Sequence, residues 1–277
     1  MRDDFAVMIC SHGRAETMTT YDILRKQGYT GKIIVVIDDE DDQRELYESR
    51  YECVEVFSKD EYADAIDEVV TNNRGSVVYA RNACYDIAAK YGLEYFVEVD
   101  DDLLSLKHRY IEDGKARGSD VNDLDTVFSF VLPIFENENI FCISFVKNSD
   151  FMGGVNSKGF KKGFEYTAHS IFCLKTDRRV KFASTIFEDL NTSLTYNRAG
   201  KIFISLAVLQ FYTKEVGTGN GGSSALYDKF SPFARAFSVL MARPDSMKIM
   251  TDKKEGHKIH MNWSTVAPMI IPERWKK

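Results

Sequence analysis

The chain has 277 residues, of which 44% are hydrophobic, and it carries a formal net charge of −6. This composition excludes a disordered chain, and the acidic balance argues against a protein that coats nucleic acid electrostatically. No apolar run approaches the roughly 20 residues that a membrane-spanning helix needs, so we expect no membrane association. The five scattered cysteines favour free thiols in a reducing compartment, and therefore a cytoplasmic protein, over a disulfide or zinc framework.

Strand-like and helix-like patterns alternate through the first third of the chain. Short apolar runs predict buried strands over residues 5–10, 32–37, 53–57 and 96–99. The segments between them predict helices over residues 17–27, 44–51, 61–71 and 81–91. This alternation predicts an α/β fold with a mostly parallel sheet, helices on both faces, and the carboxyl ends of the strands along one edge.

The second half of the chain has a less regular pattern. It predicts a helix over 124–135, strands over 140–146 and 164–174, a polar loop over 147–162 and a glycine-rich segment over 217–224. No internal repeat and no proline-rich linker interrupts the sequence, which favours a single domain over residues 1–277.

Polar residues follow three of the predicted strands, at the edge where open α/β sheets bind their ligands. They are Ser11, His12 and Arg14 after the first strand, Asp38 and Asp39 after the second, and Asp100, Asp101 and Asp102 after the fourth. An arginine can bind phosphate through two hydrogen bonds, and a carboxylate can accept from a nucleobase N–H group. The alternative for the acids at 38–42 is capping of the next helix together with solvation.

The Asp100–Asp102 triplet is the most informative of these clusters. Three adjacent carboxylates repel one another unless a cation neutralises them or water solvates them. Oxygen ligands without a nearby thiolate suit a hard divalent ion, Mn²⁺ or Mg²⁺. The alternative is an acidic turn that caps a helix beginning at Leu103.

Four motifs in this order resemble the GT-A fold of nucleotide-sugar-dependent glycosyltransferases, over roughly the first 200 residues. They are the acidic loop after the second strand, Arg81-Asn82 at a helix start, Asp100–Asp102, and Glu188-Asp189 at a later helix start. The resemblance implies one GT-A-like domain with a nucleotide-binding half at 1–110, an acceptor half at 111–250, and a tail at 251–277 that closes the site. It also implies a nucleotide-sugar donor, and we expect a UDP-sugar.

The resemblance assigns roles to individual residues. Those expected to bind the nucleotide sugar are Ser11, His12, Arg14, Asp38, Asp39, Arg81, Asn82, Asp100 and Asp101. Asp102 is expected to bind the metal together with Asp100, and the ion screens the charge on the leaving diphosphate. Some GT-A enzymes add a C-terminal histidine to the metal, which makes His257 and His260 candidates; the alternative is that both are solvated surface residues.

The acidic pair at Glu188 and Asp189 is expected to act on the acceptor. An inverting transfer needs a base that takes the proton from the acceptor hydroxyl, and we prefer Asp189 for this role. In a retaining enzyme the pair would position the acceptor instead. The structural alternative is an ordinary acidic first turn of a helix, and His169 is expected to be structural.

The layout also resembles phage glycosyltransferases of modified DNA bases, through the motifs above and the glycine-rich segment at 220–223. This resemblance implies transfer to the hydroxyl of a 5-hydroxymethylpyrimidine, which must leave the duplex to be reached, in the cytoplasm of a phage host. The candidate acceptor-binding residues are Gly221, Gly222, Ser223, Lys161 and Lys162. Three alternatives stay open: a glycan or protein acceptor, a nucleotidyltransferase, and a catalytically inactive module that binds sugar nucleotides.

Overall fold

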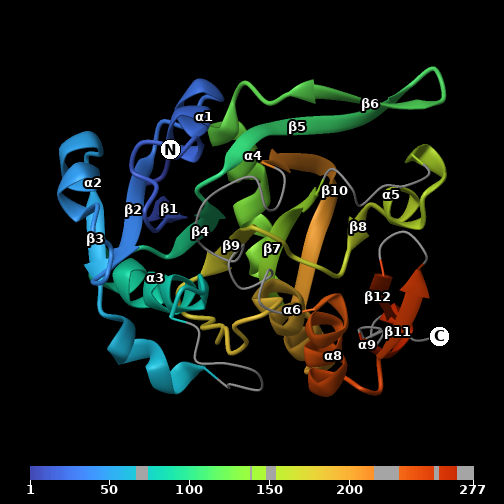
Figure 1. Cartoon of the computed structure of the whole chain (residues 1–277). Helices are drawn as coiled ribbons and strands as arrows, with labels where there is room; N and C mark the ends of the chain where they lie inside the picture. Colours follow the sequence, from blue (N-terminus) through green and yellow to red (C-terminus); the bar gives the residue numbers. More distant parts are fainter. Residues whose placement is uncertain (67–73, 138, 148–153, 215–230, 253–255, 267–277) are drawn as a thin grey trace.

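The computed structural model describes residues 1–66, 74–137, 139–147, 154–214, 231–252 and 256–266. Within these ranges, ten strands form one sheet in the order β3-β2-β1-β4-β9-β7-β10-β5-β6, and β8 pairs with β10 beside this path. Strands β11 and β12 form a separate hairpin late in the chain (Figure 1).

The elements have the following bounds. The strands of the large sheet are β1 (Phe5–Cys10), β2 (Lys32–Asp38), β3 (Val54–Phe57), β4 (Tyr95–Asp100), β5 (Leu103–Glu112), β6 (Lys115–Asp120), β7 (Ile140–Lys147), β8 (Phe164–Glu165), β9 (Ile171–Lys175) and β10 (Ile202–Thr213). The hairpin consists of β11 (Met247–Asp252) and β12 (Gly256–Met261). The helices are α1 (Thr20–Lys26), α2 (Arg44–Arg50), α3 (Val78–Lys90), α4 (Leu124–Val131), α5 (Lys158–Lys162), α6 (Glu188–Arg198), α8 (Pro232–Ala242) and α9 (Trp263–Val266). Short 3₁₀ helices cover Lys59–Ala65, Leu132–Glu136 and Gly154–Asn156.

The sheet is parallel on one side and mixed on the other. Strands β3, β2, β1 and β4 run parallel, as the alternating pattern predicts. Beyond β4, β9 is antiparallel to both β4 and β7, whereas β7 and β10 are parallel. Only Asp101 and Asp102 separate β4 from β5, which is too short for the crossover of about a dozen residues that a parallel neighbour needs. Strand β5 pairs antiparallel with β10. The α/β class is confirmed, and its parallel part carries the strand ends of the predicted nucleotide-binding half.

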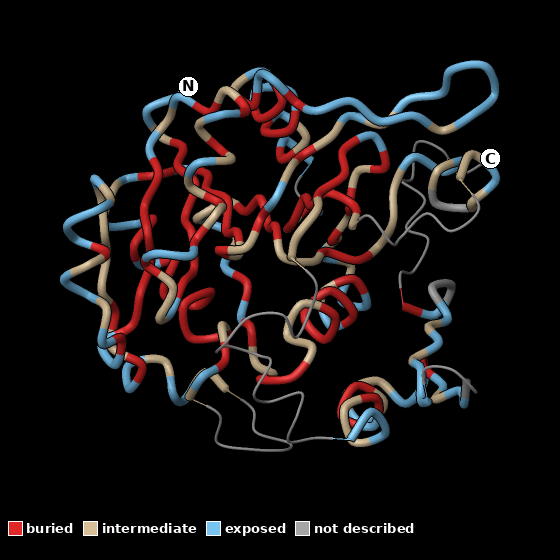
Figure 2. Tube along the Cα trace, turned by 45° about the horizontal axis from the view of Figure 1, so that its top comes forward, coloured by how far each residue is buried: buried red, intermediate tan, exposed pale blue. Residues whose placement is uncertain are grey.

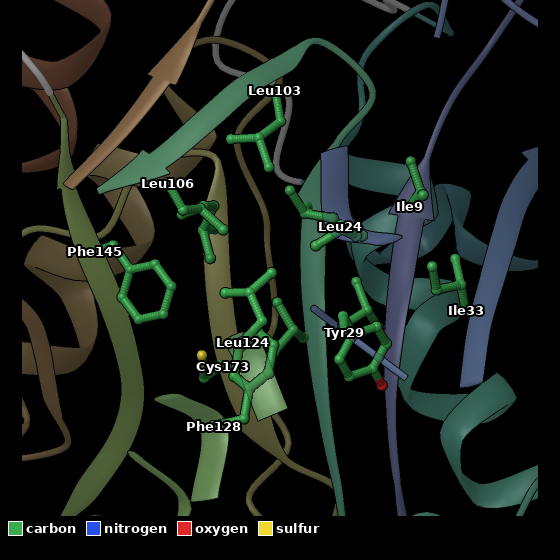
Figure 3. Close-up of a cluster of buried hydrophobic side chains, with 14 of the residues drawn as sticks. Ile9, Leu24, Tyr29, Ile33, Leu103, Leu106, Leu124, Phe128, Phe145 and Cys173 are labelled. Carbon is green, nitrogen blue, oxygen red and sulfur yellow. The ribbon is translucent and has the colours of Figure 1, made fainter. Parts of the chain in front are cut away.

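Helices bury both faces of the parallel strands. Odd-numbered residues of β1 face one core, to which α1 contributes Leu24 and α4 contributes Phe128 (Figure 3). Even-numbered residues of β1 face a second core that lies beneath α3. Burial on both faces explains why these strands are continuous apolar runs without alternation.

Several predicted elements differ in the structure. The residues after Asp102 form strand β5, so the alternative of a capped helix there is wrong; Leu103 is buried in the core instead. The predicted strand over 164–174 is divided by a turn at 166–170, where Ser170 has a φ of 50°. The helix predicted over 61–71 is a 3₁₀ helix that ends at Ala65, and residues 67–71 lie outside the described ranges.

The C-terminal elements pack on α6. Helix α8, the β11–β12 hairpin and α9 share a small core with Leu190 and Leu194 of α6. The predicted tail at 251–277 therefore begins inside this hairpin, and its closure of the site stays a prediction. Among the described residues, no helix combines the length and the apolar character that crossing a membrane requires.

Candidate active site

Arg81 joins the two acidic motifs. It lies near the start of α3, and its Nη2 donates to Asp100 Oδ1 (2.8 Å) and to Glu188 Oε1 (3.3 Å). Asp100 ends strand β4 and Glu188 begins helix α6. One guanidinium thus connects two motifs that are far apart in the sequence.

Arg81 is charged although its side chain is only 1% exposed. Its guanidinium carbon lies 4.5 Å from the ring centre of Phe172. Burial by itself lowers the pKa of an arginine, but the charges of Asp100 and Glu188 raise the pKa of Arg81 above its usual value. On the buried side, Glu98 lies 3.9 Å from Nη1, and burial raises the pKa of this carboxyl well above its usual range. Burial therefore favours the neutral form of Glu98, and the shorter contacts of the Arg81 guanidinium are those with Asp100 and Glu188.

Asp101 is held by the loop after β1. Its Oδ2 accepts a hydrogen bond from Ser11 Oγ (2.7 Å), and its Oδ1 accepts one from Arg14 Nη1 (2.7 Å). The Tyr47 hydroxyl contacts Ser11 Oγ (2.7 Å) and accepts from the backbone N–H of Arg14 (2.8 Å). Burial raises the pKa of Asp101, while Arg14 and Ser11 favour the ionised form. The structure brings these three predicted residues together. The sequence missed Tyr47 because a tyrosine in a short helix is indistinguishable from an ordinary core residue.

A second cluster lies at the end of β2. His12 Nδ1 is 2.7 Å from Asp38 Oδ2, and Lys59 Nζ is 2.8 Å from Asp38 Oδ1. The hydrogen bond with Asp38 raises the pKa of His12, against the effect of burial. Burial favours the neutral form of Asp38, but the bonds with His12 and Lys59 lower its pKa. Asp39 is exposed and accepts from the backbone N–H of Lys59 (3.1 Å). His12 and Asp38 are thus paired, and Lys59 is a partner that no sequence motif marked.

Asp102 follows Asp100 and Asp101 in the sequence, and the charges of these two acids act on it. Burial, followed by the charges of Asp100 and Asp101, raises the pKa of Asp102 to about 6. No group of three or more His, Cys, Asp or Glu side chains in the described part of the chain is arranged to hold a metal. The two outer aspartates still fit Mn²⁺ or Mg²⁺, because such ions often take one or two carboxylates and complete their shell with phosphate oxygens and water.

His169 pairs with the predicted base. Its Nδ1 lies 2.7 Å from Asp189 Oδ2, and Asp189 Oδ1 accepts from the backbone N–H of Leu190 (2.6 Å). Burial favours the neutral form of Asp189, but the bond with His169 outweighs it and the pKa of Asp189 is lowered. Burial and the charge of Asp189 raise the pKa of Glu188 to about 7. Two neighbouring carboxyls with separated pKa values are typical of acid–base sites. His169, which the sequence predicts to be structural, therefore contacts the predicted base.

The turn at 166–170 fixes this part of the site. The backbone N–H of Asp100 donates to the carbonyl of Ser170 (3.2 Å), and the N–H of Ala168 donates to Ser193 Oγ on α6 (3.1 Å). The turn therefore ties the end of β4 to α6. The alternating pattern of 164–174 predicts a continuous strand and hides the turn.

Asn82 lies next to Arg81 in α3 but makes different contacts. Its side-chain Nδ2 donates to the carbonyls of Val78 (3.0 Å) and Phe182 (2.8 Å), and its Oδ1 accepts from the N–H of Phe182 (3.0 Å). The ring of Phe182 lies 5.8 Å from the Arg81 guanidinium carbon. Asn82 thus holds a loop that packs against Arg81, and a direct contact with the nucleotide stays a prediction.

The remaining predicted residues lie in the acceptor half and the tail. His257 and His260 are exposed on β12, and the His257 ring lies 5.2 Å from that of Phe233 on α8. Lys161 and Lys162 end helix α5, and Lys162 Nζ lies 3.8 Å from the ring centre of Tyr166. Gly221, Gly222 and Ser223 lie outside the described residues.

A family model described as TET-associated glycosyltransferase matches residues 5–222, most of the chain. The chain belongs to this family. The protein is therefore a glycosyltransferase, as the resemblance of its motifs implies. No curated protein matches it significantly.

Two solved structures resemble the glycosyltransferase at low identity. One is glucosyl-3-phosphoglycerate synthase from Mycobacterium tuberculosis in complex with phosphoglyceric acid, with 10% identity, a TM-score of 0.47, and coverage of 94% of this chain and 86% of that one. The other is GalNAc-T7 with UDP, GalNAc and Mn²⁺, with 14% identity, a TM-score of 0.47, and coverage of 86% of this chain and 48% of that one. Both likenesses are distant, and the proposals below rest on neither.

Proposed function

We propose that the glycosyltransferase moves a sugar from a UDP-sugar to the hydroxyl of a 5-hydroxymethylpyrimidine base in DNA, with inversion at the sugar carbon. The observation that carries this proposal is the contact of one buried guanidinium with both Asp100 and Glu188. It brings the acidic strand end expected at the donor next to the acidic helix start expected at the acceptor. The association of the family with TET supports an oxidised, hydroxymethylated base as acceptor.

The donor side is the loop after β1 together with the ends of β2 and β4. Arg14 is fixed by Asp101, and His12 by Asp38, so both side chains stand at the strand ends before any ligand binds. The contact with Asp38 raises the pKa of His12 and so favours its cationic form. Their place suits a nucleoside diphosphate, whose phosphates need cations and whose base and ribose need hydrogen-bond partners. Asp102, together with Asp100, would hold Mn²⁺ or Mg²⁺. A bound ion of this kind would neutralise the charge that develops on the leaving diphosphate.

The acceptor side is the pair at the start of α6. We assign the base to Asp189, because its lowered pKa keeps it ionised at pH 7 and a base must start without the proton. His169 orients the carboxylate through the 2.7 Å contact. Asp189 would take the proton of the hydroxymethyl group as the oxygen of that group bonds to the sugar carbon. The bond between this carbon and the diphosphate of UDP would break at the same time. Glu188, bound to Arg81, would keep the guanidinium beside Asp100.

The experiment that tests the function is transfer from labelled UDP-sugars to two duplexes of one sequence, with and without 5-hydroxymethylcytosine. We expect label only in the hydroxymethylated duplex, and only with Mn²⁺ or Mg²⁺ present. If neither duplex is labelled and the sugar passes instead to a glycan or a protein, the proposed DNA acceptor is wrong. If transfer is equally fast in the presence of a chelator, the proposed requirement for a metal is wrong.

A further inference from the structure

The hairpin of β5 and β6 extends beyond the body of the sheet. Strand β5 pairs with β10 only as far as His108, whereas its pairing with β6 continues to Glu112. Asp113 and Gly114 at the tip have φ values of 49° and 70°, as in the two-residue turn of a regular hairpin. The hairpin reaches past the neighbouring strands (Figure 1), and its far part is exposed (Figure 2).

The hairpin presents cations and apolar side chains to solvent. Tyr110 is 42% exposed and Ile111 is 58% exposed. Its exposed cations are Lys115 and Arg117, whereas Lys107 and Arg109 are half-buried. Within the hairpin, the exposed Arg117 pairs with Glu112 (3.6 Å), and the half-buried Lys107 pairs with Asp120 (3.3 Å). An exposed pair contributes little to stability, so Arg117 can exchange Glu112 for a phosphate at small cost.

Helix α5 adds to the same surface. The Arg109 guanidinium carbon lies 5.7 Å from the ring centre of Phe160 in α5, and a Cβ on Gly154 would lie 4.0 Å from that of Ala116 in β6. Residues 103–120 and 154–166 together carry seven Lys and Arg against four Asp and Glu, in a chain whose net charge is −6. A locally basic surface on an acidic protein is complementary to a polyanion.

The length of the hairpin matches the geometry of DNA. Strand β5 has ten residues and starts directly after Asp102. At about 3.3 Å per residue, its tip lies roughly 33 Å along the strand from the acidic triplet. One helical turn of B-DNA is about 34 Å, and its major groove admits a two-stranded β-ribbon.

We propose that the β5–β6 hairpin, with α5 beside it, binds duplex DNA about one helical turn away from the base that receives the sugar. The inference rests on the DNA acceptor proposed above. Lys115 and Arg117 contact phosphates, and the exposed tip follows the groove. The contacts to the backbone do not depend on base modification.

The first test compares two double variants with the same change in charge. Lys115→Glu with Arg117→Glu alters the hairpin, and Arg44→Glu with Arg50→Glu alters α2 at the opposite edge of the sheet. Binding of an unmodified duplex is followed by fluorescence anisotropy over a salt series. We expect the hairpin variant to bind at least about tenfold more weakly, with a salt slope smaller by about 2, and the α2 variant to bind as the wild type does. Equal binding by both variants overturns the proposal.

The second test shortens the DNA on one side of a single 5-hydroxymethylcytosine. Transfer by the wild type should fall once that flank is shorter than about 10 base pairs, and the hairpin variant should be slow with every duplex. Hydrolysis of UDP-sugar without acceptor should be the same in both proteins, since the donor side is unchanged. A wild type that is insensitive to flank length overturns the proposed reach.

The outcomes also separate this inference from the proposed function. If duplex binding depends on the hairpin but no sugar is transferred to DNA, the hairpin binds DNA as proposed and the proposed acceptor base is wrong. Transfer to DNA by the hairpin variant at the wild-type rate rejects the inference alone. A change from dimer to monomer in the hairpin variant, seen by light scattering, would assign the hairpin to self-association and overturn its DNA role.

Discussion

The proposed donor side and the β5–β6 hairpin of this molecule arrange their charges in opposite ways. At the ends of the parallel strands, Asp38, Asp100 and Asp101 each contact a cation at 2.8 Å or less, and these contacts are largely buried. On the β5–β6 hairpin, Lys115 and Arg117 are exposed, and so are the acids Glu112 and Asp120. Buried pairs fix a geometry before the ligand arrives, whereas exposed cations can change partners. The comparison distinguishes a preorganised cluster at the strand ends from a hairpin whose exposed charges can still rearrange when a ligand binds.

The largest expected effect is on the donor side, at Asp102. Asp102→Asn keeps the shape of the side chain and removes the charge that a divalent ion would bind, so we expect a loss of sugar transfer of about 10³-fold or more. The same loss should follow chelation in the wild type. Transfer is measured as label in hydroxymethylated DNA.

The stability of this variant provides the control. A carboxyl whose pKa is raised in the folded state destabilises the fold as it ionises. For Asp102, this loss of stability accumulates as the pH rises from the ordinary pKa of an aspartate to the raised pKa of about 6. Without metal at pH 8, Asp102→Asn should therefore melt at a higher temperature than the wild type. An inactive variant that melts at a lower temperature would indicate misfolding and not the loss of a metal ligand.

The second effect concerns the contact between the two sides, at Arg81. Arg81→Lys cannot keep the planar guanidinium that contacts both Asp100 and Glu188, so transfer should fall by about 10²-fold and the melting temperature should drop. Arg179→Lys is a matched control, because Arg179 pairs with Asp86 through two hydrogen bonds at an exposed site. The control should lose at most about 1 kcal/mol of stability and no activity. Equal losses in the two variants would contradict the central role of Arg81.

The third effect is on the acceptor side, at His169. His169→Ala should lower kcat by about 10- to 100-fold and leave the KM for the UDP-sugar unchanged, because the histidine orients Asp189 and not the donor. His169→Asn keeps a donor near the place of Nδ1 and should recover part of kcat. Loss of donor affinity in the alanine variant, without recovery in the asparagine variant, would reduce His169 to a packing role.

The smallest effect is on the pH profile. Burial and the charge of Asp189 raise the pKa of Glu188 to about 7, so Glu188 gains its charge as pH rises through neutrality. The ionised form binds Arg81 more strongly, and transfer should increase a few-fold between about pH 6 and pH 8. Glu188→Gln should flatten this increase. A profile with the same rise in the variant would assign it to another group.

Sequence patterns predict the parallel strands and the acids at their ends well, because these features are local. Strands β1, β2 and β4 are continuous apolar runs, and the acids of 100–102 follow β4 directly. The pattern is weaker in the acceptor half, where β10 and α8 were not predicted and the turn at 166–170 interrupts an apparent strand. Strands in the acceptor half pair with strands that are distant in sequence. Their hydrophobic pattern therefore depends on neighbours that cannot be recognised from the residues of the strand itself.

The sequence by itself determined the α/β class, the acidic motifs at 100–102 and 188–189, and the resemblance to glycosyltransferases. Only the tertiary structure decided which groups act on one another. A motif states which side chains are present, but a pKa depends on burial and on charges within a few ångströms, and those neighbours come from other elements. Arg81 between Asp100 and Glu188, and His169 beside Asp189, exist because β4, α3, α6 and the turn at 166–170 meet in space.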